Sequence, residues 1–578
     1  MARCIRTGIS TITDAKLLVL LVLHLALTGL PGVAVVLFAL RRGLTRVPIL
    51  LALGLLACGV VGLLGFWTAY AGVTIGQTFA FFAVFGSILL AGLSVWGGDL
   101  DRAVLARLGE PLALWALGSA FLLFLGFLHG GTAEPLVTAA SRFSHKLPTD
   151  AEIPRFFIEW FAAHGHAGTV PVFPGEWMFS DRPPLQVGYG LYQHPFHSDQ
   201  TGLDYEVLGV ALQQLWIVGL WALLDAAGIG RRTRALTMVA VLVSGLAIVN
   251  GFFVWPKMLS AAFLLAAAAL VLTPLWDGVR RSLWGAALVA GLCGLALMGH
   301  GSSVFGVIPL VIVAAWRGLP SRRWIGVAVL VGVVVMAPWS AYQKWGDPPG
   351  NRLTKWTLAA DPGGDTLSTG AAIRKAYSEA GLGGALENKW ENFAVMLGIK
   401  GAPETVDAAF RGGNLATTVA ELRDLIFFFL LPSFTLLLVA PPAMLVRQRR
   451  RDRAGPEWRF ALRCFAVLVI GAFFWGLIVF GTPIDGTALH IFSFAVPILA
   501  TAGAIAGLRA VLPRFAIGWV GLYAVLSLIL YVPALAPPPG TSYSASAAIL
   551  AALALSGYAA VAVASPRRTA SSAAGSRT

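Results

Sequence analysis

The sequence predicts an all-α polytopic membrane protein with about fifteen transmembrane helices. Of its 578 residues, 57% are hydrophobic and only 12% are charged, and the mean hydropathy is +0.77. A soluble chain of this length cannot bury so much apolar surface, so lipid must solvate a large part of it. The apolar stretches are continuous rather than alternating and are long enough to cross a bilayer as helices, which disfavours a transmembrane β-barrel.

The apolar runs recur along the chain from Lys16 to Ala564. Taken in order, the expected spans lie near residues 16–40, 47–71, 76–97, 111–130, 205–225, 235–254, 258–275, 283–299, 303–316, 324–342, 424–446, 459–481, 488–508, 515–533 and 544–564. The run that begins at Lys16 is long enough to stay in the membrane as a span, so we do not expect a separable signal peptide there.

The net charge of +14 reflects short basic connections rather than a basic soluble domain. This pattern is typical of cytoplasmic loops and excludes nucleic acid as the expected partner. Four scattered cysteines provide neither a disulfide framework nor metal-ligand spacing. The basic connections contain Arg41, Arg42, Arg46, Arg231, Arg232, Arg234, Arg280, Arg281, Arg317, Arg322, Arg323, the run from Arg447 to Arg453, Arg509, Arg514, Arg567 and Arg568.

Placing these connections in the cytoplasm puts the N-terminus outside, the C-terminus inside, and both long loops, 131–204 and 343–423, on the extracytoplasmic face. The basic residues Arg3, Arg6 and Lys16 oppose this orientation of the first span. If that span is a half-inserted hairpin broken at Pro31, the two loops still share one side. The expected location is the plasma (inner) membrane.

We divide the chain by its spans and loops. Residues 1–109 hold additional N-terminal spans, and residues 110–342 form a core that includes the first loop. The second loop covers 343–423, the C-terminal spans cover 424–565, and the tail 566–578 is predicted to be a disordered cytoplasmic segment.

The first loop concentrates acidic, basic, aromatic and histidine side chains. Ile153, Phe157 and Phe161 recur at helical spacing, which predicts a short amphipathic helix over 153–163 lying at the membrane interface. Asp150 is placed to cap this helix. The second loop has a comparable helical stretch at 403–422.

Five segments of the chain resemble, in order, motifs of the GT-C glycosyltransferases, in particular the branch of protein O-mannosyltransferases and the lipid A aminoarabinose transferase. Asp150 and Glu152 stand where that family has an acidic pair, although Ala151 separates them. Arg182-Pro183-Pro184-Leu185 is similar to its K-P-P-L motif. The other segments are MGHGSSVFGVIPL (Met298–Leu310), APWSAYQKWG (Ala337–Gly346) and HIFSFAVPIL (His490–Leu499), with His300 and His490 at usually basic positions; the resemblance covers roughly 110–500.

The resemblance implies an inverting transfer of a sugar from a polyprenyl-phosphate donor to an extracytoplasmic lipid, glycan or protein acceptor. Such a reaction needs a base for the acceptor hydroxyl and cations for the leaving phosphate. Asp150 is the expected base, with Glu152 or Asp181 orienting the acceptor or a cation. The residues expected to bind substrate are His145, Lys146, Arg182, Lys257, His300, Arg352, Lys355 and His490.

No cofactor is assigned by these residues, and a divalent metal is left open. The histidines His145, His164, His166, His194 and His197 do not match a zinc signature.

Purely structural interpretations compete with these roles. Asp150 can serve only as a helix cap, and Asp181 and Arg182 can form an internal ion pair that shapes the loop. Lys257 can extend its amine to the outer interface, and His300 can cap its glycine-rich turn.

Two other classes of function also compete. A transporter or lipid flippase would place charged residues in mid-membrane. A polysaccharide polymerase or ligase would use a site in a late loop. The gathering of ionisable residues in loops favours the transferase.

Overall fold

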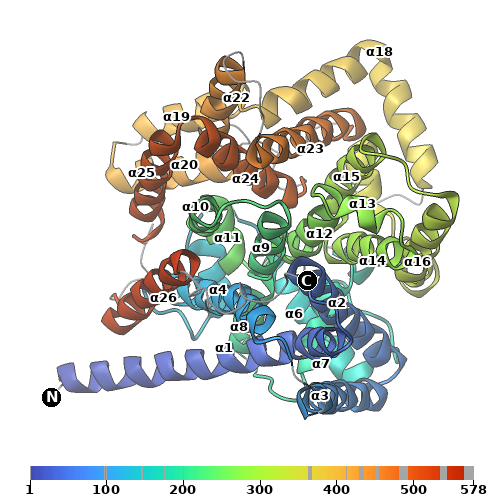
Figure 1. Cartoon of the computed structure of the whole chain (residues 1–578), viewed down its shortest axis with the longest axis vertical. Helices are drawn as coiled ribbons and strands as arrows, with labels where there is room; N and C mark the ends of the chain where they lie inside the picture. The colour runs from blue at the N-terminus through green and yellow to red at the C-terminus, as the bar shows by residue number, and fades with distance from the viewer. Residues whose placement is uncertain are drawn as a thin grey trace, which may run out of the picture.

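The computed structural model describes residues 2–96, 98, 100–144, 147–174, 177–199, 201–361, 367–411, 413–428, 435–448, 455–480, 492–533 and 543–564. These residues form helices and connecting turns without a β-strand, and their one β-bridge joins Phe173 to Trp177. The predicted all-α class is confirmed (Figure 1).

The first half of the chain contains α1 (Ala2–Arg41), α2 (Val47–Ala71), α3 (Val73–Trp96), α4 (Arg102–Gly126), α5 (Pro135–Ser141), α6 (Glu152–His164), α7 (Leu185–Gln193), α8 (Leu203–Gln213), α9 (Trp216–Ala226), α10 (Arg231–Leu242), α11 (Gly245–Phe252), α12 (Lys257–Val271), α13 (Trp276–Val279) and α14 (Leu283–Gly299). The second half contains α15 (Val304–Trp316), α16 (Arg322–Ala341), α17 (Arg352–Ala359), α18 (Thr369–Met396), α19 (Ala402–Arg411), α20 (Leu415–Phe428), α22 (Thr435–Gln448), α23 (Pro456–Ile478), α24 (Ala495–Val511), α25 (Pro513–Tyr531) and α26 (Ala545–Val563).

Among the described residues, nine helices are long and apolar enough to cross a membrane. The pair α10 and α11 adds a tenth span, bent by 54°. Four shorter apolar helices, α12, α14, α15 with the preceding turn, and α24, have 10–17 residues. The structure therefore supports a multi-pass membrane protein.

The span predicted at 235–254 corresponds to the bent pair α10 and α11. The helix stops at Leu242 and restarts at Gly245, where the hydroxyl of Ser244 accepts a hydrogen bond from the backbone N–H of Ala247. A serine that caps a new helix N-terminus in this way ends the preceding helix and permits the bend.

The bundle has two ends, which we name by their contents. At the basic end, the arginine-rich connections meet: Arg107 and Arg234 both pair with Asp225, at 2.7 and 2.9 Å, and Arg463 donates to the backbone oxygen of Leu272 at 2.7 Å. At the opposite end, which we call the loop end, the two long loops meet. There the side-chain amide of Gln343 donates to the backbone oxygen of Ser180 at 2.9 Å.

The helix α2 packs in the middle of the molecule, against α7, α9, α12 and α14. Glycines permit its close contact with α7. A Cβ atom on Gly188 would lie 2.1 Å from the backbone oxygen of Gly62, and one on Gly65 would lie 2.4 Å from the oxygen of Gly188. The first loop is therefore held directly on a membrane helix.

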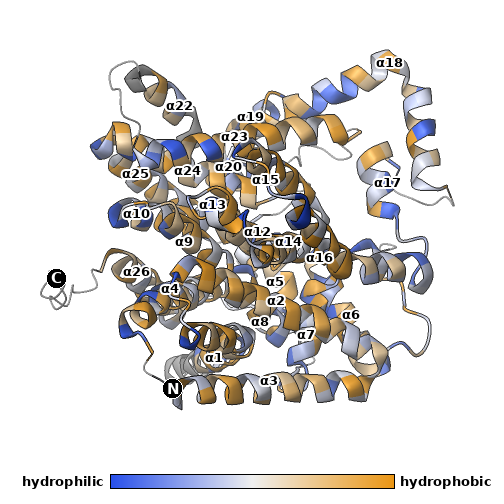
Figure 2. Ribbon diagram, turned by 45° about the vertical axis from the view of Figure 1, so that its right-hand side comes forward, coloured by the Kyte–Doolittle hydropathy of each residue, from blue (hydrophilic) through white to orange (hydrophobic). Residues whose placement is uncertain are grey.

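The second loop forms a helical arm, α17 to α20, beside the bundle (Figure 1). Its helices α17 and α18 carry many hydrophilic residues, whereas the bundle is mainly apolar (Figure 2). Lys389 and Asn392 of α18 donate to the backbone oxygen of Val479 at the end of α23, at 2.6 and 2.7 Å. This contact fastens the arm to the loop end of the bundle.

The predicted helix at 403–422 is two helices, α19 and α20, separated by a break that includes Gly413 with φ of +67°. Glycine adopts this left-handed conformation without steric cost, so the chain can turn there. The longest helix of the second loop, α18, lies before the predicted stretch.

Candidate functional site

The predicted amphipathic helix of the first loop is present as α6, Glu152–His164. Its apolar face packs on Phe179, whose ring centroid lies 5.0 Å from that of Phe157 and 4.8 Å from that of Phe161. Phe179 in turn contacts Phe66 of α2 at 5.1 Å. This aromatic packing fixes the segment that carries Asp181 and Arg182 against the bundle.

Asp150 does not cap α6, so that prediction is wrong. The capping position is Ala151, and no side chain caps the helix. Asp150 lies in the preceding 3-10 turn, and its carboxylate accepts a hydrogen bond from Arg182 at 2.7 Å. A charged hydrogen bond of this length is stronger than a bond to a neutral backbone N–H, which explains why Asp150 pairs with Arg182 and does not cap the helix.

Five side chains from both long loops form a compact group that we call the Trp177 cluster: Asp150, Trp177, Asp181, Arg182 and Arg352. The guanidinium of Arg182 lies 4.9 Å from the ring centroid of Trp177, and that of Arg352 lies 5.9 Å from it. Arg352 also pairs with Asp181 at 3.5 Å. The cluster therefore places two carboxylates and two fixed cations around one indole ring.

The predicted ion pair between Asp181 and Arg182 does not form, because each residue pairs with a different partner. Asp181 ends a 3-10 turn, while Arg182 has extended backbone angles (φ −127°, ψ 134°). The two side chains therefore point in different directions, Asp181 toward Arg352 and Arg182 toward Asp150.

Asp181 is the most buried acid of the cluster, with a side chain that is 0% exposed. One of its oxygens accepts from the backbone N–H of Met178 at 2.8 Å. The other oxygen, Oδ1, has no hydrogen-bond partner among the described residues. Burial raises the pKa of Asp181, while the Met178 N–H and the charges of Arg352 and Arg182 oppose the rise.

Asp347 joins the two loops next to the cluster. Its carboxylate accepts a hydrogen bond from the backbone N–H of Ser180 at 2.8 Å. Burial raises the pKa of Asp347, and its negative charge also contributes to the raised pKa of Asp181. This hydrogen bond joins the second loop to Ser180, the residue before Asp181. The position of Asp181 therefore depends on the second loop.

Lys257 does not extend to the interface, so that prediction is wrong. The residue is only 2% exposed, and its amine lies 4.1 Å from the ring centroid of Trp255 and 4.8 Å from that of Phe494. Arg182 and Asp150 are the charged residues that act on it electrostatically. Its first-turn position on α12 and the surrounding rings hold the amine inside the molecule.

His300 caps its turn, as the structural interpretation predicted. Its Nδ1 accepts a hydrogen bond from the backbone N–H of Ser302 at 3.1 Å. The ring also lies 5.9 Å from that of Trp255, the ring that contacts Lys257. Lys355 is buried on α17, where its amine lies 4.0 Å from Asp361.

The remaining predicted site residues are not placed in the cluster. Glu152 begins α6 and has no ion pair with a described residue. His145, Lys146 and His490 lie outside the described residues.

Sequence reasoning missed Trp177 and Asp347. Trp177 lies in the first loop, four residues before Asp181, and the proximity of an aromatic residue to charged residues was the available signal. Nothing in the local sequence indicated that Asp347 bonds to Ser180.

Within the described part of the chain, no group of three or more His, Cys, Asp or Glu side chains is placed to hold a metal ion. The charged side chains of the Trp177 cluster are carboxylates and cations, which can accept a proton and bind an anion.

Comparisons of the chain with protein-family models, with curated proteins and with solved structures found no match.

Proposed function

We propose that this protein is a membrane glycosyltransferase that moves a sugar from a polyprenyl-phosphate donor to a lipid, cell-envelope glycan or protein acceptor. One observation carries the proposal: the Trp177 cluster joins carboxylates and cations from both long loops at one end of a membrane-helix bundle. The motif resemblance to GT-C enzymes adds the substrate class.

The reaction is a single inverting displacement. The acceptor hydroxyl attacks the anomeric carbon on the face opposite the phosphate, and its proton passes to Asp150. The bond between the anomeric carbon and the phosphate oxygen breaks, and polyprenyl phosphate leaves with the electron pair. Arg182, Arg352 and Lys257 are the cations that would meet its charge.

Exposure distinguishes the two carboxylates. The side chain of Asp150 is 14% exposed, whereas that of Asp181 is 0% exposed. Asp150 is therefore the accessible proton acceptor, and Asp181 is a positioning residue that holds Arg352. Both arginines are already ion-paired, so they are oriented before a phosphate arrives, which lowers the entropic cost of binding it.

The proposal includes a topology. The nine long helices, the bent pair, the four shorter helices and α22 together make fifteen spans. The arginine-rich basic end faces the cytoplasm, so the loop end and the cluster face outward from the plasma membrane.

A transporter is a second candidate, favoured by Glu206. This residue of α8 is 0% exposed, and neither carboxylate oxygen has a hydrogen-bond partner among the described residues. Ionisable residues inside membrane bundles commonly serve ion or proton pathways. A transporter would lose substrate flux in Glu206→Gln, whereas a transferase would keep transfer.

The test is a transfer assay on the full chain in proteoliposomes, with a panel of polyprenyl-phosphate sugars and candidate acceptors. Asp150→Asn should reduce transfer by about 100-fold or more, the usual contribution of a general base. The matched control is Asp277→Asn, which changes an acid at the basic end that pairs only locally with Arg280. Full activity of Asp150→Asn would exclude Asp150 as the base, and no transfer with any donor would exclude the function.

A further inference from the structure

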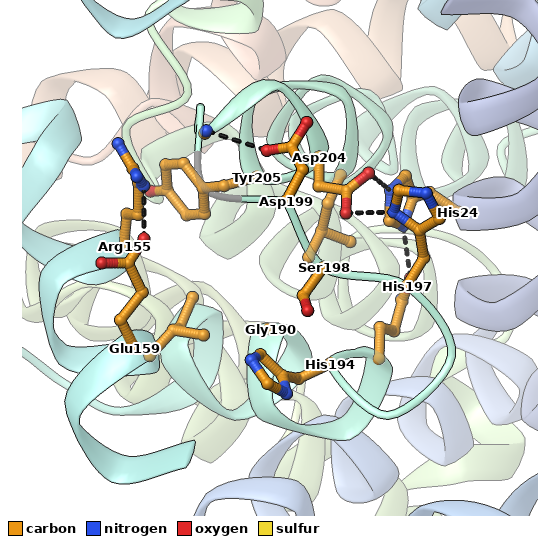
Figure 3. A pocket seen from close by; sticks show the side chains of 14 residues that line it. His24, Arg155, Glu159, Gly190, His194, His197, Ser198, Asp199, Asp204 and Tyr205 are labelled. Carbon is orange, nitrogen blue, oxygen red and sulfur yellow. Dashed lines mark hydrogen bonds and ion pairs between the residues drawn. The ribbon is translucent and has the colours of Figure 1, made fainter. Parts of the chain in front are cut away.

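A polar cavity lies between α1, α6, α7 and α8 and contains none of the Trp177 cluster residues. Its volume is about 360 Å³, in the range of small-molecule sites. We call it the histidine pocket, because His24, His194 and His197 line it together with Asp204 (Figure 3). The side chains of Ile158, Tyr205 and Leu208 provide apolar surface in its lining.

Buried polar atoms are held in place at the back of this pocket. His24 is 2% exposed and Asp204 is 6% exposed. Nδ1 of His24 donates to the side-chain oxygen of Gln193 at 2.8 Å, and the amide of Gln193 donates to the hydroxyl of Thr28 at 2.8 Å. This chain of bonds fixes the orientation of the His24 ring, so that Nε2 lies beside Asp204.

Two polar atoms lie side by side at the back of the pocket. Nε2 of His24 is 3.7 Å from Oδ1 of Asp204, and neither atom has a hydrogen-bond partner among the described residues. The other oxygen of Asp204, Oδ2, forms a hydrogen bond with Nδ1 of His197. Leaving buried polar atoms without hydrogen bonds costs free energy, so a ligand that forms hydrogen bonds with both atoms is favoured.

The charges of the pocket exclude a charged ligand. Each of its carboxylates already has a cationic or imidazole partner: Glu159 pairs with Arg155 at 2.7 Å, Asp199 with Lys16 at 3.9 Å, and Asp204 with the two histidines. An anion would meet three carboxylates, and a cation would find no unpaired one. A neutral ligand with several hydroxyl groups suits these contacts.

His194 supports a neutral ligand. Burial lowers the pKa of His194, which keeps its imidazole neutral near pH 7, with one donor and one acceptor nitrogen. Together with the apolar surface of Ile158, Tyr205 and Leu208, this lining matches a sugar ring, which has hydroxyl groups at its edge and C–H groups on its faces.

We propose that the histidine pocket binds a neutral saccharide, at a site separate from the Trp177 cluster. The inference does not require the transferase activity, because it depends only on the pocket.

The experiment measures saccharide binding to the full chain in lipid nanodiscs, by calorimetry or saturation-transfer NMR. Detergents with sugar headgroups are avoided because they would compete. The probes are glucose, galactose, mannose and maltose, with ammonium chloride and inorganic phosphate as charged probes. We expect saturable binding of at least one saccharide and none of the charged probes.

Two variants test the position. Asp204→Asn removes a charged acceptor, and Ser198→Trp places a large ring into the pocket from its exposed rim without removing a buried contact. Each should weaken saccharide binding at least tenfold. Their matched controls are Asp277→Asn and Ser378→Trp, the latter on the exposed surface of α18, and both should bind as the wild type does.

The inference is overturned if no saccharide binds saturably, if a charged probe binds in its place, or if Ser198→Trp binds within twofold of the wild type. Ser198→Trp keeps the test decisive if Asp204→Asn does not fold. Asp150→Asn should retain full saccharide binding, so a failure of the transferase proposal is distinguishable from a failure of this one.

Discussion

At the scale of single residues, the Trp177 cluster depends on crossed ion pairs between segments far apart in the chain. Asp150 pairs with Arg182, and Asp181 pairs with Arg352, which belongs to the second loop. Removing one partner would leave a buried charge without compensation, which is costly. The two loops are therefore coupled through charge as well as through packing.

Asp347→Asn is expected to shift the pH dependence of transfer. The asparagine oxygen can still accept the hydrogen bond from Ser180, but its neutral side chain no longer raises the pKa of Asp181. Asp181 will then stay ionised, and keep Arg352 in place, to a lower pH than in the wild type. The acid limb of the transfer rate against pH should move to lower pH.

The control for this shift is Asp277→Asn, whose profile should coincide with that of the wild type. An acid limb that stays in place or moves upward in Asp347→Asn would contradict the role given to Asp181.

The sequence predicted which loop segments hold the cluster but not how its members pair. Asp150, Asp181, Arg182 and Arg352 were all expected at the site, on the basis of residue type and motif order. The cap at Asp150 and the pair between Asp181 and Arg182 were wrong, because both were inferred from neighbours in sequence. The actual partners lie 32 residues from Asp150 and on the second loop, and only tertiary packing brings them together.

At the scale of elements, the close contact of α2 with α7 positions the first loop. Gly188→Ala would bring a methyl group to 2.1 Å from the backbone oxygen of Gly62, so the two helices must separate. Overpacking of this kind typically costs about 1–3 kcal/mol. We expect a lower apparent melting temperature of the purified protein, measured by intrinsic fluorescence.

Gly86→Ala on α3 is the matched control, since a Cβ atom there meets nothing within 4 Å. It should leave the melting temperature unchanged or raise it slightly, because alanine favours helix over glycine. Equal melting temperatures for both variants would show that the contact is not tight in solution.

The end of α25 is stabilised by Arg142, which follows α5. Its guanidinium donates to the backbone oxygens of Pro533, Leu125 and Val532 at 3.0, 3.3 and 2.8 Å, and the residue is 5% exposed. Helix C-termini leave carbonyl oxygens that need such partners. Arg142 therefore ties the first loop to both α4 and α25.

Arg142→Met should destabilise the protein by about 1–3 kcal/mol, the cost of leaving a buried acceptor unsatisfied. Thermal unfolding in detergent measures the effect, with the exposed Arg102→Met as control. If the two variants unfold at the same temperature, the three hydrogen bonds do not contribute to stability.

Elements were predicted well where the length of an apolar run decides them, as for α2 and α14, or where apolar residues recur at helical spacing, as for α6. The bend between α10 and α11 was missed because it depends on one serine inside an otherwise apolar run. The arm helix α18 was missed because its charged surface lacks the apolar pattern from which the other helices were predicted.

At the scale of the whole molecule, successive connections between spans lie alternately at the loop end and at the basic end. The two ends should therefore react differently with a reagent that cannot cross the membrane. In a background without cysteine, Ser198→Cys and Glu387→Cys lie on the loop end, and Asp277→Cys lies on the basic end. A membrane-impermeant maleimide added to whole cells should label the first two and not the third.

Permeabilised cells serve as the control, and there all three positions should react. Labelling of Asp277→Cys in intact cells would invert the proposed orientation. Opposite results for Ser198→Cys and Glu387→Cys would contradict the meeting of the two loops at one end.

The short length of α12 sets the depth of the cluster. This helix has 15 residues, every one of them buried, so it rises about 22 Å against a hydrocarbon layer of about 30 Å. If Val271 is level with one edge of that layer, Lys257 lies about 8 Å beneath the other edge. The floor of the site is then recessed among the acyl chains, and the polyprenyl-phosphate donor that we propose would enter sideways from the bilayer while its tail stays among the lipid chains.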